Sequence, residues 1–184
     1  MTETNARALF SNRIAGSWML DSAATTVKIS HKTMWGLLPV RGAFTGVAGE
    51  GALSTDGGLL GTLRIAAGSI DTGKRKRDER LRSKDFFDVE RHPFITVRIT
   101  SAEVIRSDLV LSADLEVTGI HEPIQLGAQV TTVSAGRVMV GVDTTIDSGR
   151  FGLSWNRFGM ATGPTKVSVT AVFNRTAIDV PGMM

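Results

Sequence analysis

Apolar and polar residues alternate along most of this sequence, and no other feature restricts the possible folds as strongly. Within 108–118, apolar side chains occupy every second position, from Leu109 to Val117. Side chains on an extended chain point to opposite sides in turn, so this period of two is typical of β-strands with one apolar and one polar face. The pattern is clear in five segments: 26–32, 95–101, 108–118, 137–146 and 166–175.

Short turn sequences lie between the apolar segments. They are TDGG at 55–58, RSD at 106–108, SAG at 134–136 and DSG at 147–149, and such clusters commonly join antiparallel strands. A sheet of many antiparallel strands must protect its edges, by closing into a barrel or by stacking two sheets. Because the connections are short, we predict an all-β fold: a closed antiparallel up-and-down β-barrel of about eight strands.

One stretch does not alternate. Residues 74–92, KRKRDERLRSKDFFDVERH, place seven basic residues before Phe86 and Phe87. We expect short helical segments near residues 75–90, over 75–82 and 84–89. They would lie at the rim of the barrel, with the phenylalanines turned inward and the cations in water. Phe86 and Phe87 would plug the barrel end, contact a ligand, or do both.

The length of 184 residues fits one folded domain. We expect the barrel over 16–176, with tails at 1–15 and 177–184. Taking Met1 as the start, the first residues do not resemble a secretory signal, and no run of ~18 apolar residues predicts a transmembrane helix. Since the chain also has no cysteine, we expect a cytoplasmic protein.

Composition favours a hollow barrel over a filled one. Aromatic residues make up only 6% of the chain, and the small residues Gly61, Ala113 and Ala171 fall on expected inner faces. A barrel of about eight strands is just wide enough to be filled by side chains or to hold one small ligand. A lining of Val, Ile, Leu and Ala leaves more room than one of Phe and Trp.

Patterns of catalysis and metal binding are missing from the sequence. It has no G-x-S-x-G elbow, no phosphate-cradling loop and no clustered metal ligands. We therefore expect no catalytic residue, no metal and no cofactor. His31 lies on an alternating apolar face, and two interpretations stay open for it. It is either a core imidazole with one polar partner, or a polar group in the cavity that binds a ligand head group.

The basic run could in principle bind nucleic acid, whose phosphates attract cations. Acidic residues such as Asp78 and Glu79 are interleaved with the cations, however, and no aromatic stacking pattern accompanies them. We therefore expect no nucleic-acid partner. A solvated helix face remains open, as does attraction to an anionic lipid head or a transient contact with a membrane surface. The candidate head-group residues are Arg75, Arg77, Arg80 and Arg82.

Six motifs in order make the chain resemble the YceI-like family, lipocalin-like barrels that bind polyisoprenoid lipids. The match runs from about residue 16 to residue 175, and the motifs are GSWMLDSAATTVKISHK at 16–32, VRGAF at 40–44, SIDTG at 69–73, RDERLRSKDFFDVERHPFITV at 77–97, LEVTGIHEPIQL at 115–126 and NRFGM at 156–160. The resemblance implies a carrier or reservoir for a polyprenyl phosphate, alcohol or quinone, and a homodimer. Many members have an export signal, which we do not find here, so a periplasmic role is not carried over.

Two other functions stay open: an enzyme that modifies an isoprenoid or quinone in the same cavity, with His31 as its acid–base group, and a filled barrel with a structural role. For the binding function, the predicted ligand contacts are the inward-facing residues and those near the mouth. Trp35, in MWGLLP, is also a candidate gate at the entrance. The full set is Val27, Ile29, His31, Trp35, Phe44, Leu63, Phe86, Phe87, Ile95, Val97, Ile99, Leu109, Leu111, Leu115 and Val169.

Overall fold

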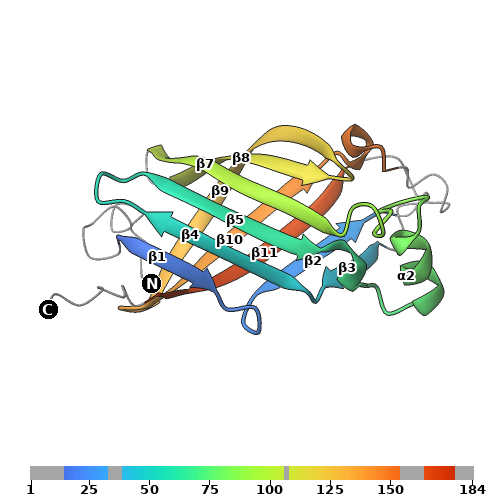
Figure 1. Ribbon diagram of the computed structural model, residues 1–184, viewed down its shortest axis with the longest axis horizontal. Helices are drawn as coiled ribbons and strands as arrows, with labels where there is room; N and C mark the ends of the chain where they lie inside the picture. Colours follow the sequence, from blue (N-terminus) through green and yellow to red (C-terminus); the bar gives the residue numbers. More distant parts are fainter. Residues whose placement is uncertain (1–14, 33–38, 106–107, 154–163, 177–184) are drawn as a thin grey trace, which may run out of the picture.

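Eight antiparallel strands close into a barrel in the computed structural model, which describes residues 15–32, 39–105, 108–153 and 164–176 (Figure 1). This confirms the predicted fold. The ring is formed, in order, by β1 (Gly16–Leu20), β4 (Val47–Leu53), β5 (Leu59–Ala66), β7 (Phe94–Ile105), β8 (Asp108–Val117), β9 (Ile120–Ser134), β10 (Arg137–Ile146) and β11 (Thr165–Arg175). β1 pairs with both β4 and β11, which closes the ring.

Three short strands, β2 (Thr26–His31), β3 (Val40–Phe44) and β6 (Ile70–Asp71), continue the wall at one end. β1 and β2 share one edge of β11, because Leu20 pairs with Phe173 while Thr26 pairs with Thr170 further along. In the same way β3 and β4 lie on the β2–β1 edge, and β5 and β6 on the β4–β3 edge. Each pair acts as one bent strand, so the chain follows the expected meander.

The alternating segments of the sequence coincide with β2, β7, β8, β10 and β11. In β8, every second residue from Leu109 to Val117 is buried. The alternation does not reveal β4 and β5, because Gly49, Gly51 and Gly61 occupy positions on their inner faces. A glycine gives no apolar signal, although the backbone pairing there is continuous from Leu53–Leu59 to Val47–Ile65.

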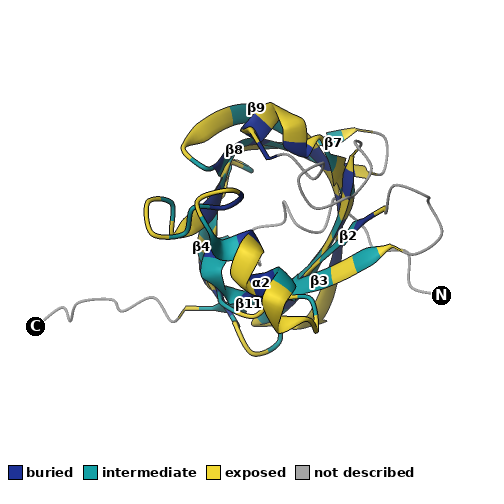
Figure 2. Ribbon diagram, turned by 90° about the vertical axis from the view of Figure 1, so that its right-hand side faces the viewer, coloured by how far each residue is buried: buried dark blue, intermediate teal, exposed yellow. Residues whose placement is uncertain are grey.

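Helix α2 (Arg75–Arg82) lies at one end of the barrel, which we call the α2 end (Figures 1 and 2). The predicted segment 84–89 forms hydrogen-bonded turns instead of a second helix: Phe87 N donates to Leu81 O, and Asp88 N to Ser83 O. Asp88 has a φ of 45°, which is outside the helical range. Two short 3₁₀ turns, η1 (Ala67–Ser69) and η2 (Ser148–Phe151), complete the described elements.

The buried core has two parts that follow the long axis of the barrel. One includes Ile70, Leu81 and the three rings of Phe44, Phe86 and Phe87 at the α2 end. The other lies toward the opposite end and includes Trp18, built from β1, β8, β9 and β10. The ring of Phe87 makes edge contacts with Phe86, at a centroid distance of 4.8 Å, and with Phe44, at 5.9 Å. The three aromatic side chains therefore pack against one another at the α2 end. That they plug the barrel stays a prediction.

Candidate ligand-binding cavity

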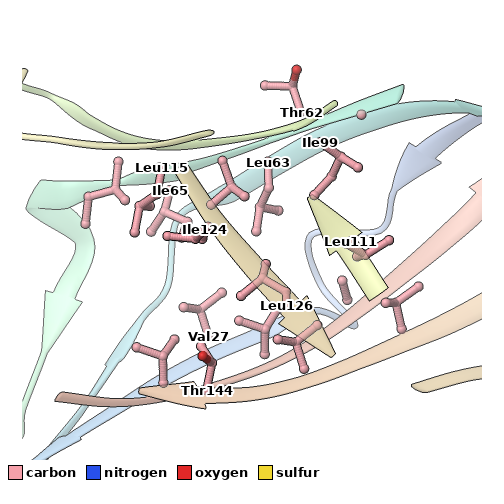
Figure 3. A pocket seen from close by; sticks show the side chains of 18 of the residues that line it. Val27, Thr62, Leu63, Ile65, Ile99, Leu111, Leu115, Ile124, Leu126 and Thr144 are labelled. Carbon is pink, nitrogen blue, oxygen red and sulfur yellow. The ribbon is translucent and has the colours of Figure 1, made fainter. Parts of the chain in front are cut away.

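A cavity of about 300 Å³ lies inside the barrel (Figure 3). It runs from Trp18 toward Phe87 and Phe151 at the α2 end, so it extends through both parts of the core. Its volume is at the lower limit of ordinary small-molecule sites, which span roughly 300–1,000 Å³. The interior is therefore large enough for a ligand.

Inward-facing residues of the strands supply the lining, and Figure 3 shows Leu63, Leu126 and Val27 directed into the space between the walls. The structure brings together at this cavity the following residues that the sequence predicted: Val27, Ile29, Phe44, Leu63, Phe87, Ile95, Val97, Ile99, Leu109, Leu111, Leu115 and Val169. They meet there because alternate positions of neighbouring strands share one face. That they contact a ligand stays a prediction.

His31 and Phe86 are buried but do not line the cavity. Phe86 packs behind Phe87. The imidazole of His31 lies behind Thr165, with its Nδ1 3.1 Å from Thr165 Oγ1. This is the polar partner that the first of the two interpretations of His31 required. Trp35 lies outside the described residues.

Sequence reasoning missed part of the lining. Ile124, Leu126 and Val130 of β9 belong to it, and their spacing of two or four could have revealed them. Gly51 and Gly61, which pair across β4 and β5, also belong to it. Because neither glycine has a side chain, the cavity is bounded there by the backbone, and it reaches the flanking Leu60 and Thr62.

Three residues that carry hydroxyl groups border the cavity near the α2 end, namely Thr144 of β10, Ser148 of η2 and Thr165 of β11, although the surface that faces the cavity is almost entirely apolar. Ile146 and Thr165 are paired across β10 and β11, which sets the end of one strand beside the start of the other. Ser148 Oγ lies 3.3 Å from Thr165 Oγ1. No sequence pattern distinguishes these residues from outward-facing Ser and Thr.

The four head-group candidates do not line the cavity. Arg77 donates to the hydroxyl and the carbonyl oxygen of Thr72, and Arg82 Nη2 donates to Ile70 O at 2.7 Å. Arg75 pairs with Glu79 in water at 2.9 Å, and Arg80 is exposed on α2. Two of the cations therefore hold the helix against the barrel wall, and two lie on the solvent side.

Other polar clusters offer little chemistry. On the outer face of β7, β8 and β9, Arg98 pairs with Glu116 at 3.1 Å, and His121 with Asp114 at 2.8 Å. These side chains are half or partly exposed, where ion pairs contribute little to stability. No group of three potential metal ligands occurs among the residues that the structure describes. Within the same residues, none of the helices is both long and apolar enough to cross a membrane.

Comparison with known proteins identifies a family. A family profile described as a YceI-like domain matches residues 18–174. A UPF0312 protein of Photorhabdus laumondii is 38% identical over 71 residues, which cover 38% of this chain and 35% of that protein. Protein YceI of Escherichia coli is 36% identical over 62 residues, which cover 34% of this chain and 32% of the relative. Each match thus spans about a third of the relative's length.

Two solved structures share the fold. BcnA of Burkholderia cenocepacia has a TM-score of 0.75 at 17% identity, with 83% of this chain and 98% of that chain covered. A polyisoprenoid binding domain from Saccharophagus degradans has a TM-score of 0.71 at 20% identity, with 86% and 98% covered. At such identities the likeness concerns the fold alone. Since the family profile covers most of the sequence and the barrel agrees with it, this chain belongs to the YceI-like family.

Proposed function

We propose that this protein binds a long apolar lipid of the polyisoprenoid class inside its barrel and serves as a carrier or reservoir for it. The observation that carries the proposal is the cavity itself, an interior space of about 300 Å³ lined mainly by Val, Leu and Ile. The structural relative from Saccharophagus degradans, a polyisoprenoid binding domain, supports the choice of lipid class.

The energetics of such a site favour a long hydrocarbon. Each methylene group that leaves water contributes ~0.8 kcal/mol, so a chain of several isoprene units needs few polar contacts to bind. Branched aliphatic walls, such as those formed by Val97, Leu115 and Val169, suit a methyl-branched chain because both pack through many weak dispersion contacts.

Binding accounts for the lining better than catalysis does. General acid–base chemistry needs a titratable group within hydrogen-bond reach of the reacting atom. His31, the acid–base candidate from the sequence, lies behind Thr165 and not in the lining. Among the described lining residues, the one with an ionisable side chain is Glu50, which is exposed on β4.

The test is retention of a lipid during purification without detergent. We expect native mass spectrometry to show bound mass, and organic extraction to recover an isoprenoid that is chemically unchanged after incubation with the protein. Val169→Phe should reduce retention because Val169 faces the cavity, whereas Ser168→Phe, its exposed neighbour on β11, should not. The proposal fails when the folded protein takes up no polyprenol on reconstitution, when Val169→Phe retains as much as the wild type, or when the lipid is converted.

A further inference from the structure

A hollow on the outside of the barrel crosses the wall formed by β10, β11, β2 and β3. Its polar side chains point away from the interior, because they alternate along the strands with cavity-lining residues such as Val27 and Val169. Three of these side chains are exposed cations: Lys28 of β2, Arg41 of β3 and Lys166 of β11. We call them the outer basic cluster.

The strand register brings the three cations of this cluster close together. Lys166 pairs with Ser30, and Ser30 pairs with Arg41, so these residues form one row across three strands. Lys28 lies two residues before Ser30 on the same face of β2. Neighbours within such a row have their Cβ atoms about 4.5–5.5 Å apart. The long side chains of Lys166 and Arg41 can therefore reach one anionic group beside Ser30 from two sides.

Carboxylates neutralise the cations of another wall of the barrel but not those of the outer basic cluster. On β7, Arg98 lies 3.1 Å from Glu116 and 3.7 Å from Asp114. Among the described residues, no ion pair includes a cation of the cluster. The segments 33–38 and 154–163, which adjoin β2, β3 and β11 in the sequence, contain no Asp or Glu, so they supply no carboxylate either.

The basic surface continues onto the start of α2, which lies beside β2 and β3 at this end of the barrel (Figures 1 and 2). Two carboxylates, Asp71 and Asp143, also border the hollow. Asp71 Oδ1 accepts a hydrogen bond from Gly73 N at 2.8 Å, in the turn that leads to α2. The next residues, 74–76, are all basic and exposed. Together with the cluster they outnumber Asp71, Asp143 and the nearby Glu79.

An excess of exposed cations attracts a membrane surface that carries anionic lipids. The row across β11, β2 and β3 suits a lipid phosphate in particular. The guanidinium of Arg41 can bond two phosphate oxygens at once, and the hydroxyl of Ser30 can donate to a third. A bilayer is also the place where a carrier collects and releases a lipid that is insoluble in water.

We infer that the outer basic cluster, with residues 74–76, docks the barrel on a bilayer that contains anionic phospholipids. The wall of β11, β2 and β3 and the start of α2 then face the head groups. The inference goes beyond the proposed function, which concerns what the barrel holds inside. Docking concerns the outer surface and does not depend on the identity of the bound lipid.

Flotation with vesicles tests the docking. The wild type should bind phosphatidylcholine vesicles that contain phosphatidylglycerol but not vesicles of phosphatidylcholine alone, and about 1 M salt should abolish the binding by screening. Lys28→Gln, Arg41→Gln and Lys166→Gln should each lower the affinity about fivefold. Arg98→Gln removes the same charge from β7 and should leave the affinity unchanged. Thermal melting confirms that the variants are folded.

A fluorescent label shows which face meets the membrane. Since the chain has no cysteine, a single introduced cysteine can carry an environment-sensitive fluorophore. Ser168→Cys places it in the hollow, and Gln125→Cys places it on the outer face of β9; both positions are exposed. Anionic vesicles should shift the emission of the label at Ser168 to the blue and leave the label at Gln125 unchanged.

The outcomes distinguish this inference from the proposed function. Equal losses of affinity in Arg98→Gln and in the cluster variants, or a response of the Gln125 label alone, would overturn the docking surface. No binding to anionic vesicles by a protein that retains polyprenol would overturn the docking and leave the proposed function standing. Vesicle binding by a protein that takes up no polyprenol would do the reverse. Tighter binding of a DNA duplex than of the vesicles would overturn the choice of a membrane.

Discussion

Asp78 and Thr72 are joined by two hydrogen bonds that fasten α2 to the end of β6. Asp78 Oδ1 accepts one from the Thr72 backbone N–H, at 3.0 Å, and a second from the Thr72 hydroxyl. Asp78 is only 6% exposed, and its charge lies in the first turn of the helix, where the helix dipole favours an anion. The charged helix is thus anchored by a buried carboxylate.

Removing this carboxylate should destabilise the protein. We expect Asp78→Ala to lower the free energy of unfolding by about 1–3 kcal/mol, because it leaves the Thr72 donors without their acceptor. Glu79→Ala, one residue further along α2, removes an exposed pair with Arg75 and should cost at most ~0.5 kcal/mol. Urea titration of both variants is the measurement. Equal losses of unfolding free energy in the two variants would mean that the Asp78–Thr72 contact contributes no more to stability than the exposed pair of Arg75 and Glu79.

Phe86 and Phe87 should separate stability from binding. Both are buried, at 4% and 5% exposure, so replacing either with leucine should cost about 0.5–3 kcal/mol. Phe87 lines the cavity and Phe86 does not. Phe87→Leu should therefore change the affinity for an isoprenoid probe, measured by calorimetry, while Phe86→Leu should change only the melting temperature. A change in affinity with Phe86→Leu alone would contradict this assignment.

Gly51 offers a way to fill the cavity from its wall. A Cβ built on Gly51 would meet Leu60 O at 3.4 Å, an ordinary contact, and Gly51 itself lines the cavity. We expect Gly51→Val to fold, since β-branched residues favour strands, and to reduce the chain length of the lipid that is retained.

The neighbouring Ala52 is the matched control, because it is exposed on the outer face of β4. Ala52→Val should leave the retained lipid unchanged. Mass spectrometry after loading with a mixture of polyprenols measures the chain lengths. An identical distribution for Gly51→Val and the wild type would place the ligand elsewhere.

Acid should weaken the contact between Asp21 and β10. Arg137 Nη2 lies 2.9 Å from Asp21 Oδ2, and this hydrogen bond lowers the pKa of Asp21 below its usual value of 3.8. Because the pKa of Asp21 is lower in the folded state than in the unfolded state, its charge stabilises the fold at pH values above the unfolded pKa. This stabilisation is lost as the pH falls through the pKa of the folded state.

Asp21→Asn should therefore be less stable than the wild type at pH 7, and the difference should shrink as the pH falls below about 4. Denaturation midpoints at pH 7 and at pH 3 measure it. A difference that stays constant between these pH values would show that the charge of Asp21 does not contribute.

The sequence pattern predicts much of the barrel, but it predicts the lining of the cavity less completely. Alternation reveals both β8 and the inward direction of Leu111 and Leu115, because burial on one face imposes a period of two on the sequence. Alternation does not reveal an inner face that contains Gly49 and Gly51, because a glycine has no side chain and gives no apolar signal. Such a strand is recognisable only from its pairing.

Polar residues of the site depend on the tertiary structure. Ser148 and Thr165 lie side by side because η2 follows β10 and β11 pairs with β10. In the sequence, neither residue differs from the Ser and Thr of an ordinary surface turn. Arg77 and Arg82 look like solvated cations in the sequence. Their hydrogen bonds to the carbonyl oxygens of Thr72 and Ile70 depend on where β6 ends. No local sequence pattern specifies that position.

Closure of the ring between its first and last strands has a consequence for synthesis of the protein. β1 meets β11 through three residue pairs, from Trp18–Arg175 to Leu20–Phe173. A nascent chain cannot form these pairs until β11 has left the ribosome, so the apolar inner face stays on an open sheet with two unpaired edges until then. The same short seam joins segments that are far apart in the chain, whose pairing is slow and entropically costly. We therefore expect this seam to form late in folding.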